Sequence, residues 1–191
     1  SYENIEETLP KHTKRLIKDA DRRNVQIIHG QGELLDEFSR LVELTESRKG
    51  VALRDKEYFK TLLENYPEGS VIFLATCNVY QLDKEIAIAG ILSIQYGNTC
   101  EMLYAGMDER FKKFMPQYKE YVENFKWAFD RRCLWSNMGG VEGSLDDGLT
   151  KFKDNFNPTI NEFIGEFDIP VYPIMYRLTQ KAYEILKSKH K

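Results

Sequence analysis

Cysteine and histidine are scarce in this sequence. The 191 residues include three cysteines, Cys77, Cys100 and Cys133, and three scattered histidines. No CxxC pair occurs, and no histidine lies beside a cysteine. An odd number of dispersed cysteines argues against a disulfide framework and a structural zinc site, and it fits a reducing compartment. We therefore expect no bound metal ion and no catalytic triad built on histidine.

Long apolar runs and a strong charge imbalance are also missing. The longest apolar runs, around residues 71–77 and 86–94, are too short to cross a bilayer. Residues 1–10 are acidic and lack the apolar core of a signal peptide. The first residue is Ser1, and we expect the chain to be part of a longer protein. The formal net charge of -3 excludes a polybasic nucleic-acid binder, so any RNA contact would need a local basic patch.

What is present is the composition of a globular domain. The sequence is 42% hydrophobic and 30% charged, without internal repeats or low-complexity segments. Its length suits one compact domain, and we predict a single domain over residues 1–191.

The apolar spacing predicts a mixed α/β order of elements. Three consecutive strands, rich in β-branched and aromatic residues, predict an antiparallel meander at the centre of the chain. We predict helices over residues 9–24, 33–49, 56–65, 116–132, 146–155 and 173–189. We predict strands over residues 25–29, 70–80, 85–96, 99–107, 133–138 and 159–169. A meander followed by a strand, a helix and a strand is the order of elements in the GNAT acyltransferase fold. The pattern by itself gives only α/β or α+β.

Short segments in a particular order add a resemblance to this pattern. They read LYAG, MPQY, FKWA, MGGV, DGLTKFK and EFIGEFD, and they begin at Leu103, Met115, Phe125, Met138, Asp147 and Glu162. Upstream, KRLIKDA begins at Lys14 and LRDKEYF at Leu53. This series resembles the Fem family of peptidoglycan bridge enzymes (FemX, FemA, FemB and the MurM-like branching enzymes). The likeness extends over almost the whole chain.

The resemblance implies a GNAT-like fold and a place within a larger protein. Members of that family have two GNAT-like domains, and this chain is similar to the second. An amino-terminal GNAT-like domain would then be missing, and the helix at residues 173–191 would return to it. We expect a short turn at residues 78–85, where FemA-type members carry a long helical arm.

The resemblance also implies an activity. It points to an aminoacyltransferase that moves Ser, Ala or Gly from an aminoacyl-tRNA to the stem-peptide lysine of lipid II or of UDP-MurNAc-pentapeptide. Such an enzyme consumes no cofactor. It would act in the cytoplasm, at the inner face of the cell membrane.

Four residues become site candidates through this likeness. Lys153 matches the family's FK lysine, which is implicated in stabilising an oxyanion, and Tyr104 matches a strand tyrosine that would orient substrate. Arg54 would bind a diphosphate, for which a guanidinium is suited, and Lys151 would contact substrate. Solvated lysines, a core tyrosine and a helix-start arginine are the alternative interpretations.

The helix that contains Lys153 also has its own start signal. Asp146, Asp147 and Gly148 are expected to form its amino-terminal cap and first turn.

A basic stripe is predicted on the first helix. Lys11, Lys14, Arg15, Lys18 and Arg22 recur at intervals of three or four residues and fall on one side of the helix. Such a stripe could bind tRNA phosphates or anionic lipid headgroups, and a solvated helix face is the alternative.

Two other functions stay open. CoA-dependent GNAT enzymes carry a glycine-containing loop after their fourth strand, whose amides cradle a pyrophosphate. Residues 105–113 lack the second and third loop residues of that pattern, which argues against a CoA-dependent N-acetyltransferase. The third possibility is a non-catalytic fragment that binds substrate or tRNA.

Overall fold

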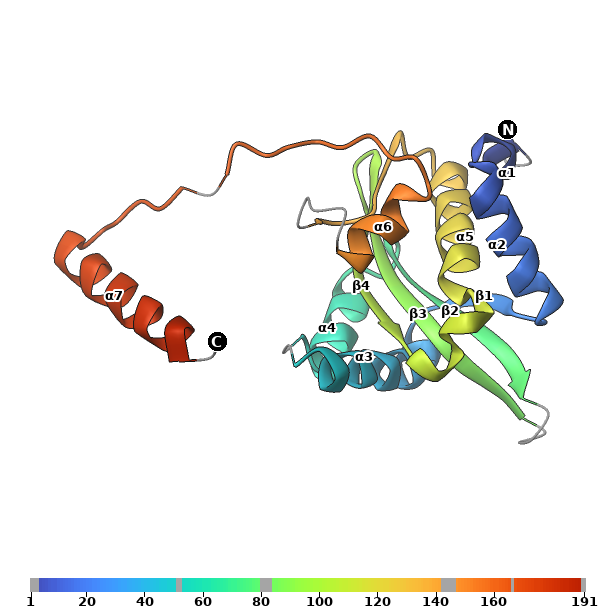
Figure 1. The fold of residues 1–191 in the computed structure, drawn as a ribbon, viewed down its shortest axis with the longest axis horizontal. Coiled ribbons are helices and arrows are strands. Elements are labelled where there is room, and N and C mark those ends of the chain that lie inside the picture. The colour runs from blue at the N-terminus through green and yellow to red at the C-terminus, as the bar shows by residue number, and fades with distance from the viewer. Residues whose placement is uncertain (1–3, 51–52, 80–83, 142–146, 166, 190–191) are drawn as a thin grey trace. The chain divides into compact units, whose positions relative to one another are not determined.

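A five-stranded mixed sheet forms the centre of the structure. The computed structural model describes residues 4–50, 53–79, 84–141, 147–165 and 167–189. The strands lie in chain order: β1 (Gln26–Gly30), β2 (Ser70–Val79), β3 (Lys84–Tyr96), β4 (Thr99–Met107) and β5 (Trp135–Asn137). Neighbours are antiparallel except β4 and β5, which run parallel (Figure 1). The predicted meander and the mixed α/β class are confirmed.

Helices cover both faces of this sheet. On one face lie α3 (Leu35–Lys49) and α4 (Lys56–Asn65), and on the other α2 (Lys11–Arg22) and α5 (Pro116–Asp130) (Figure 1). The short elements are α1 (Ile5–Thr8), η2 (Gly32–Leu34), η3 (Glu109–Phe114) and α6 (Gly148–Asp154). Alternation along β2 assigns its side chains to the two faces. Ile72 and Leu74 join the α3 core, whereas Ala75 joins the core beneath α5.

The α3 face is closely packed because one glycine lets the helix approach the sheet. Phe38, Leu41 and Phe59 are fully buried there. A Cβ on Gly106 of β4 would lie 2.5 Å from the carbonyl carbon of Leu41 and 2.6 Å from the amide nitrogen of Val42. Both are backbone atoms, so no side-chain rotation could make room.

Aromatic side chains and hydrogen bonds hold α6 in place on the opposite face. Phe152 lies edge-on to Tyr118 and Tyr121, at centroid distances of 5.1 and 4.9 Å. The Thr13 hydroxyl of α2 donates to the Asn155 carbonyl directly after α6. The end of α6 is therefore fixed to both α5 and α2.

Most predicted elements lie within a few residues of the observed ones, but one strand is wrong. Residues 159–165 and 167–169 pair with no strand among the described residues, and Phe163 and Ile164 are exposed. A strand exists only through hydrogen bonds to a neighbouring strand, and here the extended segment has no such partner. Residues 80–83, at the predicted short turn, lie outside the described residues.

The chain divides into two compact units, Ser1–Pro158 and Thr159–Lys191. The second unit contains α7 (Pro173–Lys189), which begins and ends as predicted. Ile174, Met175 and Leu178 are exposed on this helix.

Candidate active site

Arg54, Tyr58 and Tyr104 come together at the start of α4. The Arg54 guanidinium carbon lies 5.2 Å from the centre of the Tyr58 ring. The Tyr104 hydroxyl donates a hydrogen bond to the Tyr58 hydroxyl at 3.4 Å. Tyr104 also lies edge-on to Phe59, whose buried ring fixes its position. The two residues predicted from the sequence, Arg54 and Tyr104, are thus joined by Tyr58.

Local sequence explains why these side chains are presented at this place. The Asp55 side chain accepts a hydrogen bond from the Tyr58 amide at 2.9 Å and caps α4. Arg54 immediately precedes the cap and is exposed. No carboxylate of the described residues forms an ion pair with Arg54, so its guanidinium is available to an anion.

The environment of Tyr58 keeps its phenol neutral. The hydrogen bond with Tyr104 raises the pKa of Tyr58 above its ordinary value, partial burial adds to this, and the charge of Arg54 opposes it. At neutral pH, Tyr58 is therefore a hydrogen-bond donor and acceptor, without charge.

A β-bulge determines the face of the sheet on which Tyr104 lies. Leu92 of β3 pairs with Tyr104 and Ser93 with Met102, so Leu103 is an extra residue in β4. Because side chains alternate along a strand, this extra residue puts Met102 and Tyr104 on opposite faces. Met102 packs beneath α5, whereas Tyr104 packs against α4.

Lys153 lies on the α5 side of the same strand. Its residue is 7% exposed, and its Nζ donates to the carbonyl oxygens of Gly139 at 3.0 Å and Gly140 at 2.8 Å. Gly139 adopts φ +76°, a conformation that favours glycine, and its amide donates to the Asn137 side chain at 2.9 Å. The ammonium therefore lies against the two exposed glycines that follow β5.

Arg54, Tyr58 and Tyr104 lie on one side of the β4 edge. Lys153 and the glycine turn that it contacts lie on the other side. A Cβ on Gly139 would lie 3.7 Å from the Met102 carbonyl oxygen, so the glycine turn adjoins β4 two residues before Tyr104. Two residues of a strand span roughly 7 Å. As far as the described residues go, β5 pairs with β4 at Thr99–Glu101 and then separates from it.

The remaining predicted residues lie on the surface. Lys151 is exposed on α6, and the Asp147 side chain caps that helix by accepting from the Thr150 amide at 2.8 Å. Asp146 lies outside the described residues. The five basic residues of α2 line one open concavity of about 330 Å³.

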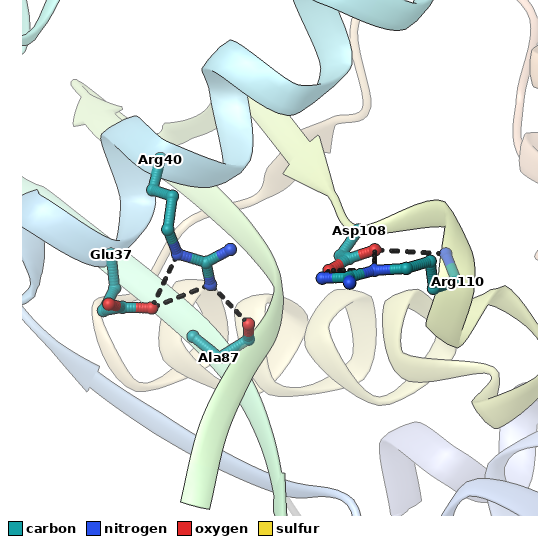
Figure 2. Close-up of polar contacts among 5 residues, drawn as sticks. All are labelled: Glu37, Arg40, Ala87, Asp108 and Arg110. Carbon is teal, nitrogen blue, oxygen red and sulfur yellow. Dashed lines mark hydrogen bonds and ion pairs between the residues drawn. The ribbon is translucent and has the colours of Figure 1, made fainter.

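The loop after β4 is occupied by an ion pair (Figure 2). Asp108 is 5% exposed. The Arg110 guanidinium donates hydrogen bonds to its carboxylate from Nε at 2.9 Å and from Nη2 at 2.6 Å. These hydrogen bonds, and the nearby Arg40, hold the pKa of Asp108 below its ordinary value, although burial opposes them. Arg40 itself bridges the Glu37 carboxylate and the Ala87 carbonyl.

Two features were not predicted from the sequence. Tyr58 was part of a recognised segment, and its position in the first turn of the helix that follows Arg54 was the signal that could have found it. Glu120 of α5 is fully buried, and its Oε1 accepts from the Ala75 amide at 3.2 Å while Oε2 has no partner among the described residues. Burial raises the pKa of Glu120 well above 4.5, against the effect of the Ala75 amide.

The described part of the chain contains neither a cluster of metal-binding residues nor a helix that could span a membrane. No three His, Cys, Asp or Glu residues are grouped there as metal ligands would be. No described helix has both the length and the apolar character of a bilayer-spanning segment. Cys77, Cys100 and Cys133 are free thiols.

Comparison with protein families gives one match over nearly the whole chain. The family described as FemAB matches residues 1–87 and 80–184. A protein named lipid II:glycine glycyltransferase from Staphylococcus epidermidis is 28% identical over 102 residues, which are 51% of this chain and 24% of that protein. Aminoacyltransferase FemB of the same species is 29% identical over 92 residues, which are 44% of this chain and 22% of FemB. This chain thus spans about a quarter of the length of these relatives.

Solved structures show the same fold. A crystal structure of FemX superimposes with a TM-score of 0.77 at 17% identity, covering 93% of this chain and 61% of FemX. An aminoglycoside acetyltransferase from an uncultured soil metagenomic sample gives a TM-score of 0.58 at 17% identity, with 79% of this chain and 98% of that chain covered. The predicted GNAT-like fold is confirmed.

Proposed function

Because this chain belongs to the FemAB family, we propose that it is part of an aminoacyltransferase that builds peptidoglycan cross-bridges. The names of two relatives, a lipid II:glycine glycyltransferase and an aminoacyltransferase, support this class of reaction. The observation that carries the proposal is the placement of Arg54, Tyr58 and Tyr104 beside the β4 edge that also adjoins the Lys153 turn.

In the proposed reaction, the stem-peptide lysine attacks the ester carbonyl of an aminoacyl-tRNA. The new bond joins the amine nitrogen to the carbonyl carbon, and the bond to the ribose oxygen breaks. The amine loses a proton, and the departing ribose oxygen gains one. The amino acid is Ser, Ala or Gly, and the acceptor is lipid II or UDP-MurNAc-pentapeptide.

The acceptor's diphosphate is assigned to Arg54. A guanidinium binds phosphate oxygens in pairs, and the Tyr58 ring beneath it limits the directions that it can take. The Tyr58 and Tyr104 hydroxyls offer further hydrogen bonds to the substrate, and exposed Lys151 adds a charge on α6.

Lys153 is assigned to the negative charge that develops on the attacked carbonyl oxygen. Two backbone carbonyls already orient its ammonium, so little reorganisation is needed when that charge appears. The aromatic contacts of the neighbouring Phe152 keep α6, and with it Lys153, at a fixed position.

The CoA-dependent alternative is less well supported by the loop after β4. The exposed Arg110 guanidinium there is already paired with the carboxylate of Asp108, so it offers a pyrophosphate less net charge than a free arginine would. The next helix, α5, begins with Met115 at φ 56° and Pro116, which has no amide hydrogen to donate. This helix start therefore offers a phosphate fewer donors than an ordinary one.

The rest of the enzyme is proposed to include a first GNAT-like domain, since this chain covers 61% of FemX and about a quarter of the curated relatives. The exposed apolar residues of α7 would pack against that domain. The enzyme would work in the cytoplasm, at the inner membrane face, where a lipid-linked acceptor is held.

The decisive experiment is transfer from labelled Ser-, Ala- and Gly-tRNA by the complete protein, with lipid II and UDP-MurNAc-pentapeptide as acceptors. Labelled product with one of these donors is expected. Absence of product with all of them, together with thermal stabilisation by acetyl-CoA, would favour the N-acetyltransferase instead. Running this chain alone in parallel shows whether it catalyses transfer without the rest of the protein.

A further inference from the structure

The outer side of α2 carries a line of positive charge. Its members are Lys11, Lys14, Arg15, Lys18 and Arg22, here called the α2 stripe. With 3.6 residues per turn, these positions fall within a sector of about 100° around the helix axis. They line a single open concavity, so the five side chains share one surface.

The α2 stripe is held by a rigid support. The opposite side of the helix, with Thr13, Leu16, Ile17 and Ala20, is buried in the core. At 1.5 Å per residue, the stripe extends for about 16 Å from Lys11 to Arg22. The cations are therefore presented along a fixed line, unlike those of a flexible tail.

Few carboxylates neutralise this line. Asp19 pairs with Arg22 at 3.0 Å, at the end of the helix. Asp21 is instead engaged by Lys119 of α5 at 2.8 Å. Lys14 donates to a backbone carbonyl, that of Glu7, which leaves its charge in place. As far as the described residues go, Lys11 and Lys18 form no ion pair.

The lack of exposed apolar residues on this side of α2 helps to decide whether the α2 stripe binds RNA or an anionic membrane. Helices that bind membranes insert apolar side chains between lipids, with basic residues around them. The apolar side of α2 is used by the protein core, and no large apolar residue of this helix is exposed. A purely electrostatic line suits a phosphate backbone better than a bilayer.

The position of the stripe also favours RNA. Thr13, between Lys11 and Lys14, is hydrogen-bonded to the Asn155 carbonyl, and Asn155 lies two residues after Lys153. One end of the stripe is thus tied to the helix whose lysine is assigned to the ester.

We propose that the α2 stripe binds the sugar-phosphate backbone of an RNA and so docks the aminoacyl donor. The choice of RNA as ligand rests on the function proposed above, whereas the surface is identified by its own geometry and charge. About three phosphates fit along its length.

A salt titration tests this directly. This chain would be titrated against a fluorescein-labelled RNA hairpin without an amino acid, and binding followed by fluorescence anisotropy. With about three phosphates neutralised, affinity should fall roughly 40-fold between about 50 and about 200 mM KCl. The triple variant Lys11→Gln, Arg15→Gln, Lys18→Gln should bind at least about 10-fold more weakly, with a salt slope flatter by about 1 to 2 because Lys14 and Arg22 remain.

A matched triple variant supplies the control. Lys60→Gln, Lys112→Gln and Lys113→Gln remove the same charge from exposed positions outside the stripe, and hairpin affinity should change less than about 2-fold. Equal losses in both triple variants would overturn the proposal. So would stripe-dependent binding to phosphatidylglycerol vesicles without stripe-dependent binding to the hairpin.

The same measurements separate this inference from the proposed function. Because the hairpin carries no amino acid, its binding does not depend on transfer chemistry. Transfer by the complete protein without stripe-dependent hairpin binding overturns the docking surface alone. Stripe-dependent hairpin binding without transfer overturns the aminoacyltransferase alone.

Discussion

Key polar side chains are exposed on the α4 side of the sheet and buried on the α5 side. On the α4 side, Arg54 and Tyr58 are exposed, and a substrate can reach them. On the α5 side, Lys153 and Glu120 are buried, and each is hydrogen-bonded to backbone groups. The first side therefore presents its polar groups to solvent, and the second holds charged or titratable groups at fixed positions.

The two buried side chains, Lys153 and Glu120, differ in their hydrogen-bond partners. The Lys153 ammonium meets two carbonyl oxygens, whereas Glu120 meets one amide and leaves one oxygen without a partner among the described residues. A buried polar group is tolerated when dipoles of the right sign are aimed at it. Lys153 fulfils that condition, whereas the burial of Glu120 raises its pKa and so favours its neutral form.

The largest effect on stability is expected where α3 touches the sheet. Gly106→Ala should lower the free energy of unfolding of this chain by about 2–3 kcal/mol, because the new methyl group would meet the α3 backbone. Urea denaturation measures it. Gly148→Ala is the control, since nothing lies within 4 Å of a Cβ there. Equal stability of the two variants would show that α3 does not pack as described.

A smaller, pH-dependent effect is expected at Glu120. Its folded-state pKa is raised, so its contribution to stability is complete below about pH 4.5 and declines as the pH rises towards the folded-state pKa. Glu120→Gln should remove this decline, so the free energy of unfolding of the variant should rise relative to that of the wild type between about pH 4 and about pH 8. Urea denaturation at both pH values tests this. Parallel pH profiles of variant and wild type would show that Glu120 is not buried as a neutral acid.

Arg54 should affect substrate binding more than the chemical step. Arg54→Lys loses the paired hydrogen bonds of a guanidinium, so in the complete protein the KM for a diphosphate-containing acceptor should rise about 10-fold, with kcat nearly unchanged. Arg132→Lys, at an exposed arginine elsewhere, is the control. A fall in kcat at constant KM would assign Arg54 a different role.

The smallest effect is expected at Tyr104. Its hydroxyl bond to Tyr58 is long, at 3.4 Å, and its ring packing against Phe59 survives in a phenylalanine. Tyr104→Phe in the complete protein should therefore lower kcat/KM about 2- to 5-fold. A loss of 100-fold or more would mean that this hydroxyl takes part in the chemistry directly.

Features fixed by local sequence could be predicted, and features fixed by distant partners could not. Helix α4 and the Asp147 cap were predicted because their signals lie within one turn of chain. The Leu103 bulge depends on the register with β3, and no signal in β4 itself revealed it. The predicted strand at residues 159–169 failed because it has no partner strand among the described residues.

In the candidate site, too, contacts between residues far apart in the sequence could not be predicted. Lys153 and Arg54 were found through short motifs. The two carbonyls that hold Lys153 lie 14 and 13 residues away, across a turn that no periodicity predicts. Tyr58 was missed because its partner, Tyr104, is 46 residues distant.

Single-turnover transfer by a Lys153→Met variant of the complete protein tests the central claim most directly. Methionine has a similar length but no charge, and Lys153→Arg restores the charge. We predict at least a roughly 100-fold slower rate for the methionine variant, with partial recovery by arginine and a wild-type rate for the control Lys112→Ala, whose lysine is exposed. A correctly folded Lys153→Met protein that transfers at the wild-type rate would contradict the account.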